Sequence, residues 1–95
     1  MFNCLCYSIV VELDVSPPVV DCDTVTVSFS SNGRTQCQLD HGNFRNCKSP
    51  YSRSGLRGGQ HTITIRATDG RSGYVQKTAT FAIVLGMVYC HLLVQ

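Results

Sequence analysis

Two cysteines that bracket a short polar segment are the residues of this 95-residue chain best suited to chemistry. Cys37 and Cys47 lie on either side of a polar stretch with Gly42 at its middle. Zinc knuckles need cysteines roughly two to four residues apart, and thiol redox centres need a C-x-x-C pair beside a helix N-terminus. Neither pattern occurs here, so we predict a disulfide between Cys37 and Cys47 and rank a metal or redox site below it.

The disulfide requires a hairpin that brings the two cysteines together. Residues 36–39 alternate in polarity, residues 40–43 are turn-like, and the chain then returns toward Cys47. We expect Leu39 to pair with Phe44 across a four-residue loop, with both side chains facing the core. A bulge in the returning strand then places Cys47 opposite Cys37. Directly opposed cysteines in a non-hydrogen-bonded pair are close enough to form a disulfide.

The residue pattern contains no motif typical of acid–base or nucleophilic catalysis. Serine, histidine and aspartate are all present, but there is no G-x-S-x-G nucleophile elbow and no paired-carboxylate motif. His41 falls in the predicted turn and His61 begins a strand, so both are interpreted as exposed or hydrogen-bonding side chains. We therefore predict a protein that is not an enzyme, with no catalytic residues, no metal site and no cofactor.

The basic residues suggest a second kind of site. All eight lie between Arg34 and Lys77, where the only acids are Asp40 and Asp69. Outward side chains on neighbouring strands can align into a positive stripe that attracts polyanions. The competing interpretation, which we favour, is that the arginines are scattered over both sheets. The candidate polyanion-binding residues are Arg45, Lys48, Arg53, Arg57 and Arg66.

Three alternating runs indicate the elements that must position these residues. Residues 25–30, 61–68 and 78–84 alternate apolar and polar side chains and are rich in β-branched types. No apolar helical period persists along the chain, and short alternating strands at this spacing predict an all-β sandwich. We expect an N-terminal segment of uncertain structure over 1–18, the domain over 19–85, and an apolar C-terminal extension over 86–95. The predicted core residues are Val27, Phe29, Leu39, Leu56, Ile63, Ile65, Phe81 and Ile83.

The six cysteines favour an oxidising compartment, because disulfides compensate for the limited core of a small domain. The sequence leaves the pairing of Cys4, Cys6, Cys22 and Cys90 open. The start of the chain lacks a basic region and a cleavage site typical of a signal peptide. Residues 79–94 are apolar enough to raise membrane contact as an alternative, which we rank below a core strand followed by an extension.

A family resemblance becomes visible over residues 37–70. This segment is similar to an immunoglobulin-like repeat of extracellular, adhesion-type proteins, of the bacterial-immunoglobulin and fibronectin-III-like kind, with the outline C-x-L-D-x-G-x-F-x-x-C-x-S-P followed by L-x-x-G-x-H and A-x-D. His41 departs from the small residue usual before the first glycine. Residues 70–73 replace a longer turn of the family. The residues on the motif are Cys37, Leu39, Asp40, Gly42, Phe44, Cys47, Ser49, Pro50, Leu56, Gly59, His61, Ala67 and Asp69.

The resemblance implies an immunoglobulin-like antiparallel β-sandwich at the cell surface or outside the cell. Its function would be adhesion, spacing or ligand binding as a repeat module of a larger or truncated surface protein. The alternative is a free-standing, cysteine-rich secreted effector or inhibitor. The expected partner is an extracellular protein or a sulfated glycan. Nucleic acid is not expected, because aromatic residues do not interleave with the arginines.

Overall fold

The computed structural model describes residues 11–70 and 73–85, and every regular element within them is a β-strand. The strands are β1 (Leu13–Val15), β2 (Val19–Asp21), β3 (Thr24–Val27), β4 (Phe29–Ser31), β5 (Arg34–Leu39), β6 (Arg45–Asn46), β7 (Tyr51–Arg53), β8 (Gly59–Thr68) and β9 (Tyr74–Ile83). All of their pairings are antiparallel. The all-β prediction is therefore confirmed.

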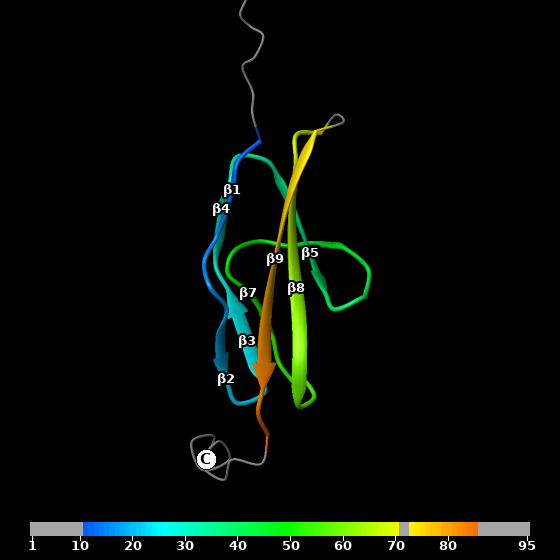
Figure 1. The fold of residues 1–95 in the computed structure, drawn as a ribbon. Helices are drawn as coiled ribbons and strands as arrows, with labels where there is room; N and C mark the ends of the chain where they lie inside the picture. Colours follow the sequence, from blue (N-terminus) through cyan, green and yellow to red (C-terminus); the bar gives the residue numbers. More distant parts are fainter. Residues whose placement is uncertain (1–10, 71–72, 86–95) are drawn as a thin grey trace, which may run out of the picture.

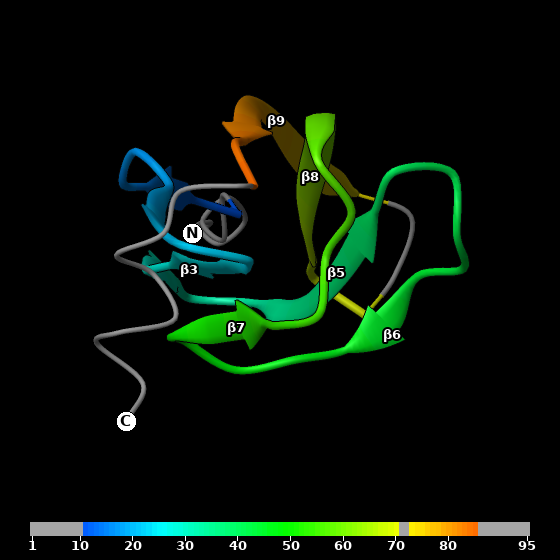
Figure 2. The ribbon, with the colours of Figure 1, turned by 90° about the horizontal axis from the view of Figure 1, so that it is seen from below.

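The strands form a sandwich-like arrangement of two layers (Figures 1 and 2). One layer is the four-stranded sheet β6-β5-β8-β9. The other consists of the three-stranded sheet β2-β3-β7 and, further along the molecule, the pair β1-β4. The long strands β8 and β9 match the alternating runs 61–68 and 78–84, because β-branched residues facing alternately inward and outward suit a sheet with one buried face.

The run over residues 25–30 forms two strands, where the sequence predicts one. β3 ends at Val27 and β4 begins at Phe29, and the intervening Ser28 carbonyl accepts a hydrogen bond from the Ser16 amide at 2.9 Å. The facing chain is interrupted at the same level by Pro17 and the following proline, which have no N–H to donate. Alternation persists through Ser28, so the sequence pattern does not reveal the break.

The core lies between the two layers. Six of the eight predicted core residues are buried, while Phe29 and Leu39 are half-buried and pack against the cluster. The buried cluster consists of Leu13, Val25, Val27, Cys37, Leu56, Ile63, Ile65, Ala67, Phe81 and Ile83. Leu13 belongs to β1, so the packed part of the described chain includes residues that the sequence analysis placed in the N-terminal segment. The predicted extension over 86–95 lies outside the described residues.

The disulfide between Cys37 and Cys47 is present, with Cα atoms 5.8 Å apart. The predicted register of its hairpin is wrong. Cys37 pairs with Arg45 and Gln36 with Asn46, and Cys47 lies beyond the end of β6. There the Cys47 amide donates to the Thr35 carbonyl at 3.1 Å.

The shifted register also moves Phe44 to the other side of the sheet. A strand offset by one residue turns its side chains to the opposite face. Phe44 accordingly lies over the guanidinium of Arg66, on the outer face of the four-stranded sheet, and is absent from the core cluster. Leu39 keeps its predicted inward orientation. Cys22 also forms a disulfide, and Cys4, Cys6 and Cys90 lie outside the described residues.

Candidate functional site

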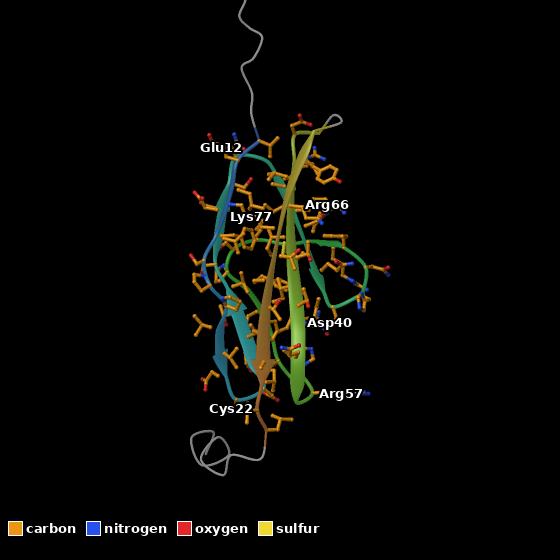
Figure 3. The ribbon with its side chains drawn as sticks, viewed as in Figure 1. Glu12, Cys22, Asp40, Arg57, Arg66 and Lys77 are labelled. Atoms are coloured by element: carbon orange, nitrogen blue, oxygen red, sulfur yellow. A yellow bond between two sulfur atoms is a disulfide. The ribbon has the colours of Figure 1, made fainter. Side chains whose placement is uncertain are left out.

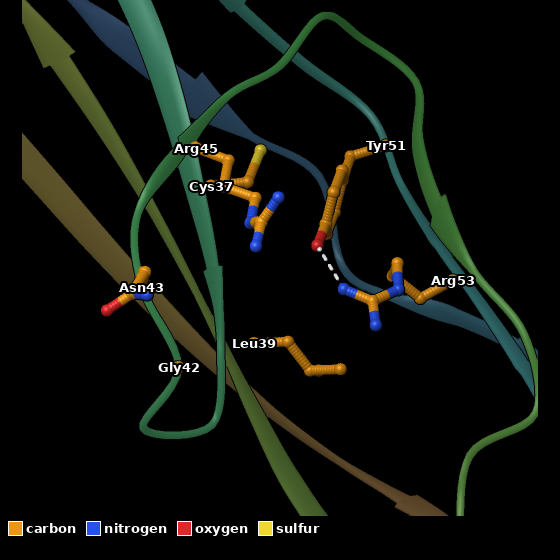
Figure 4. A pocket seen from close by; sticks show the side chains of 7 residues that line it. All are labelled: Cys37, Leu39, Gly42, Asn43, Arg45, Tyr51 and Arg53. Carbon is orange, nitrogen blue, oxygen red and sulfur yellow. Dashed lines mark hydrogen bonds between the residues drawn. The ribbon is translucent and has the colours of Figure 1, made fainter.

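A hollow of about 500 Å³ opens between the two layers (Figure 4). It lies where β6 and β7 run along the same side of the molecule, an arrangement of the strands that Figure 2 shows. We call it the arginine hollow. It is lined by Cys37, Leu39, Gly42, Asn43, Arg45, Tyr51 and Arg53. These residues come from β5, the β5–β6 loop, β6 and β7. The disulfide ties the β6 end of the hairpin to β5, while β7 is held in the opposite layer by its pairing with β3.

Arg45 enters the hollow because of the hairpin register. It is paired with Cys37, whose side chain is buried, so both side chains lie on the inner face of the sheet. β6 is an edge strand of only two residues, which leaves the Arg45 guanidinium open to solvent. In the register expected from the sequence, Arg45 faces outward. The observed register turns it inward, into the site.

Arg53 reaches the same hollow from the opposite layer. Its Nη1 donates a hydrogen bond to the Tyr51 hydroxyl oxygen at 3.2 Å, and both side chains belong to β7 (Figure 4). The bond orients the guanidinium along the rim and leaves most of its N–H groups unused by the described residues. Tyr51 is half-buried against the core and adds an aromatic face to the site.

The lining favours an anionic ligand. Two guanidinium groups and a phenol border a space with the apolar side chain of Leu39 on one wall, and no lining residue is a carboxylic acid. Guanidinium groups hold carboxylate and sulfate oxygens through paired N–H donors and remain charged at all physiological pH values. Asn43 and Tyr51 belong to this site although the sequence analysis did not select them, because only the folded hairpin brings them to Arg45 and Arg53.

The other candidate basic residues lie elsewhere. The Arg66 Cζ is 3.9 Å from the ring centroid of Phe44 and 5.1 Å from that of Tyr74. Its Nε donates to Gln76 at 3.1 Å. Arg66 therefore stabilises the outer face of the four-stranded sheet. Arg57 lies in the connection from β7 to β8, near one end of the molecule (Figure 3).

Lys48 lines a second hollow of about 470 Å³, which includes Arg34 and Asn46. Asn46 follows Arg45 in β6, so the two cationic hollows lie on opposite sides of this short strand. The five candidate residues, four arginines and one lysine, thus do not form one stripe. Arg45 and Arg53 share the arginine hollow, and Lys48 lies beside a neighbouring one.

A polar cluster next to the arginine hollow was not predicted from the sequence. Asp40 Oδ2 lies 2.8 Å from His61 Nδ1, and Asp40 Oδ1 accepts the Thr62 amide at 2.9 Å. The remaining ring nitrogen of His61, Nε2, lies 2.7 Å from the Arg57 carbonyl oxygen. The imidazole stacks on Phe81 of β9 at a centroid distance of 5.5 Å. The interpretation of His61 as a hydrogen-bonding side chain fits this arrangement, but residues so distant in sequence gave no sign of pairing.

Both members of the pair have shifted pKa values. The hydrogen bond to Asp40 is the largest cause that raises the pKa of His61 above 6.5, and the bond to the Arg57 carbonyl acts in the same direction. Burial alone would raise the pKa of Asp40, but the bonds from His61 and the Thr62 amide outweigh it and lower that pKa below 3.8. The folded chain therefore favours a charged pair.

The described residues offer neither a metal-binding cluster nor a membrane-spanning helix. Within residues 11–70 and 73–85, no group of three or more histidine, cysteine or acidic side chains is placed to hold a metal ion. The same residues contain no helix long and apolar enough to cross a membrane. Of the apolar segment 79–94, residues 79–83 belong to β9 and pair with β8, while residues 86–94 lie outside the described part.

No protein-family profile, curated protein or solved structure matches this chain.

Proposed function

We propose that this chain is a non-enzymatic, immunoglobulin-like extracellular module that binds an anionic group of a sulfated glycan or an acidic protein in the arginine hollow. The observation that carries the proposal is the presence of Arg45 and Arg53 in one hollow that no carboxylic acid lines. Among the described residues, the only ion pair is Asp40 with His61, so neither arginine is neutralised by a neighbouring acid.

The extracellular assignment is supported by the disulfide and the fold. A disulfide that closes a short hairpin persists in oxidising environments and is rare in reducing ones. Antiparallel sheets of short strands are also the architecture of many cell-surface modules that serve adhesion or spacing. The motif over residues 37–70 supports the immunoglobulin-like assignment, since its cysteines form the hairpin disulfide and its leucine at position 56 is buried in the core.

The chemistry of the hollow favours one class of ligand. A sulfate or carboxylate can accept N–H groups from both guanidiniums, while a sugar ring or side chain attached to it packs on Tyr51 and Leu39. The second hollow, with Arg34 and Lys48, lies across β6 and offers a site for the next charge of a linear polyanion. A sulfated glycan combines these features, because its charges recur along a chain of rings.

The test is calorimetric titration of the 95-residue chain with a heparin-derived oligosaccharide at low and high salt. Replacing Arg45→Gln and Arg53→Gln together should weaken binding by at least about tenfold, because charge-assisted hydrogen bonds to the anion are lost. The affinity of the wild-type chain should fall as salt rises, through screening of the charges.

The matched control removes two charges outside both hollows, through Arg57→Gln with Lys77→Gln. It should reduce affinity much less, because only the net charge of the protein changes. Equal losses in the two double variants would show general attraction to a basic protein and no site at the arginine hollow. A folded wild-type chain that fails to bind at low salt would leave spacing as its function.

A further inference from the structure

Both ring nitrogens of His61 face groups that can only accept hydrogen bonds. Nδ1 lies 2.8 Å from a carboxylate oxygen of Asp40, and Nε2 lies 2.7 Å from the Arg57 carbonyl oxygen. A carbonyl oxygen has no hydrogen to donate, and an ionised carboxylate has none either. Both nitrogens must therefore carry hydrogens, and this arrangement requires the imidazolium form of His61.

The same pair fixes the base of the loop between β5 and β6. Asp40 has a left-handed backbone conformation (φ 55°) and exchanges two hydrogen bonds with Thr62, through its amide and its carboxylate. The Gly42 amide donates to the Leu39 carbonyl at 3.0 Å and closes the turn directly after Asp40. Gly42 and Asn43, the residues that follow, line the arginine hollow. One wall of the hollow is therefore attached to β8 through Asp40.

We propose that Asp40 and His61 form a pH-operated latch on the arginine hollow, in which protonated His61 holds the loop wall in place and its deprotonation weakens anion binding. A neutral imidazole has one N–H, so one of the two acceptors then faces a lone pair at hydrogen-bond distance. That contact is repulsive and must open, either at Asp40 or at Arg57. The proposal extends the proposed function, because the regulated event is anion binding in the hollow.

The groups that surround His61 are consistent with His61 being the side chain whose protonation operates the latch. β5 ends on the loop that contributes Asp40 and then His41, the other titratable group that acts on the Asp40 carboxylate. The connection before β8 contributes the Arg57 carbonyl, while its guanidinium extends away from the pair (Figure 3). β9 contributes the uncharged ring of Phe81. Arg45 and Arg53 stay charged over the same pH range, so the charge of the hollow itself is constant.

The test compares the affinity of the 95-residue chain for a heparin-derived oligosaccharide at about pH 5 and about pH 8.5, with ionic strength fixed, across the titration range of histidine. The wild-type affinity should fall by about fivefold at the higher pH, a coupling typical of linked sites. The double variant His41→Gln/His91→Gln, in which His61 is the only histidine, should show the same fall. His61→Gln should show none, because its amide does not titrate.

A second measurement is independent of the ligand. Amide exchange by NMR should give a smaller protection factor for Thr62 at the higher pH, after correction for the intrinsic exchange rate, because its acceptor is Asp40. An equal pH dependence of affinity in His61→Gln, or constant wild-type affinity, would overturn the latch. If neither the wild type nor any variant binds the oligosaccharide, the proposed function fails. The latch is then tested by the Thr62 amide alone, and a protection factor that does not change with pH would refute it.

Discussion

At the scale of single residues, the stability of the domain depends on a charged pair with opposite pKa shifts. The raised pKa of His61 means that its contribution is complete below pH 6.5 and is lost as pH rises through the folded-state value. The lowered pKa of Asp40 means that its contribution is complete above pH 3.8 and is lost as pH falls through the folded-state value. Both contributions are complete between those two pH values.

We therefore expect the pair to favour the highest melting temperature between pH 3.8 and pH 6.5. His61→Gln should flatten the decline on the alkaline side, because the variant has no imidazole to lose its proton. Asp40→Asn should lower the melting temperature throughout this range, because the ion pair is lost. Thermal unfolding monitored by circular dichroism across pH checks both. A decline on the alkaline side that is unchanged in His61→Gln would assign it to another group.

At the scale of elements, the β5–β6 hairpin depends on its disulfide more than on its strands. β6 has only two residues, both exposed, and contributes little apolar burial of its own. The chain beyond it is attached through the Cys37–Cys47 bond and the hydrogen bonds to Thr35, whose hydroxyl donates to the Cys47 carbonyl at 2.7 Å. The disulfide thus fixes the position of Arg45 in the arginine hollow.

Replacing both cysteines, through Cys37→Ala with Cys47→Ala, should lower the free energy of unfolding by about 2–3 kcal/mol, because the unfolded chain regains the freedom that the short closed loop removes. Truncating the buried Cys37 side chain adds a smaller cavity cost. Chemical denaturation of the oxidised wild type and the variant measures the difference. Cys47→Ala alone serves as the control, because it breaks the disulfide but keeps the buried Cys37 side chain. It should account for most of the loss, and the difference from the double variant measures the cavity cost.

The sequence predicts the long strands well and the hairpin register poorly, for a physical reason. Residues 61–68 and 78–84 alternate over many positions, so a single phase satisfies the whole run. The loop after β5 depends instead on the positive φ of Asp40, which is held by His61 and Thr62 from β8. Such support from distant residues leaves no local pattern, and the resulting offset turned Phe44 outward and Arg45 inward.

At the scale of the whole molecule, the packed domain is longer than the alternating runs suggest. β1 pairs with β4, and its Leu13 is 5% exposed within the core, whereas Val19 of β2 is 66% exposed. The sequence placed Leu13 before the expected domain start at residue 19, because a three-residue strand before two prolines has too little alternation to detect. Leu13 and Val19 therefore look alike in the sequence, but only Leu13 is buried and should contribute strongly to stability.

Leu13→Ala should lower the free energy of unfolding by about 2–5 kcal/mol, the cost of a cavity in a packed core. Val19→Ala, on the exposed β2, should change it by no more than about 0.5 kcal/mol. Equilibrium urea unfolding of the two 95-residue variants makes the comparison. Similar small effects at both positions would mean that β1 is peripheral to the domain.

The positions of the first and last described residues affect how the domain would respond to a pulling force. The described chain enters at one end of the long axis, before β1, and leaves at the other, after β9 (Figure 1). Tension between these ends runs along the strands, while the hydrogen bonds between β8 and β9 lie across them. The ladder is thus loaded in shear, and its bonds resist together. A domain built this way would extend little before it unfolds.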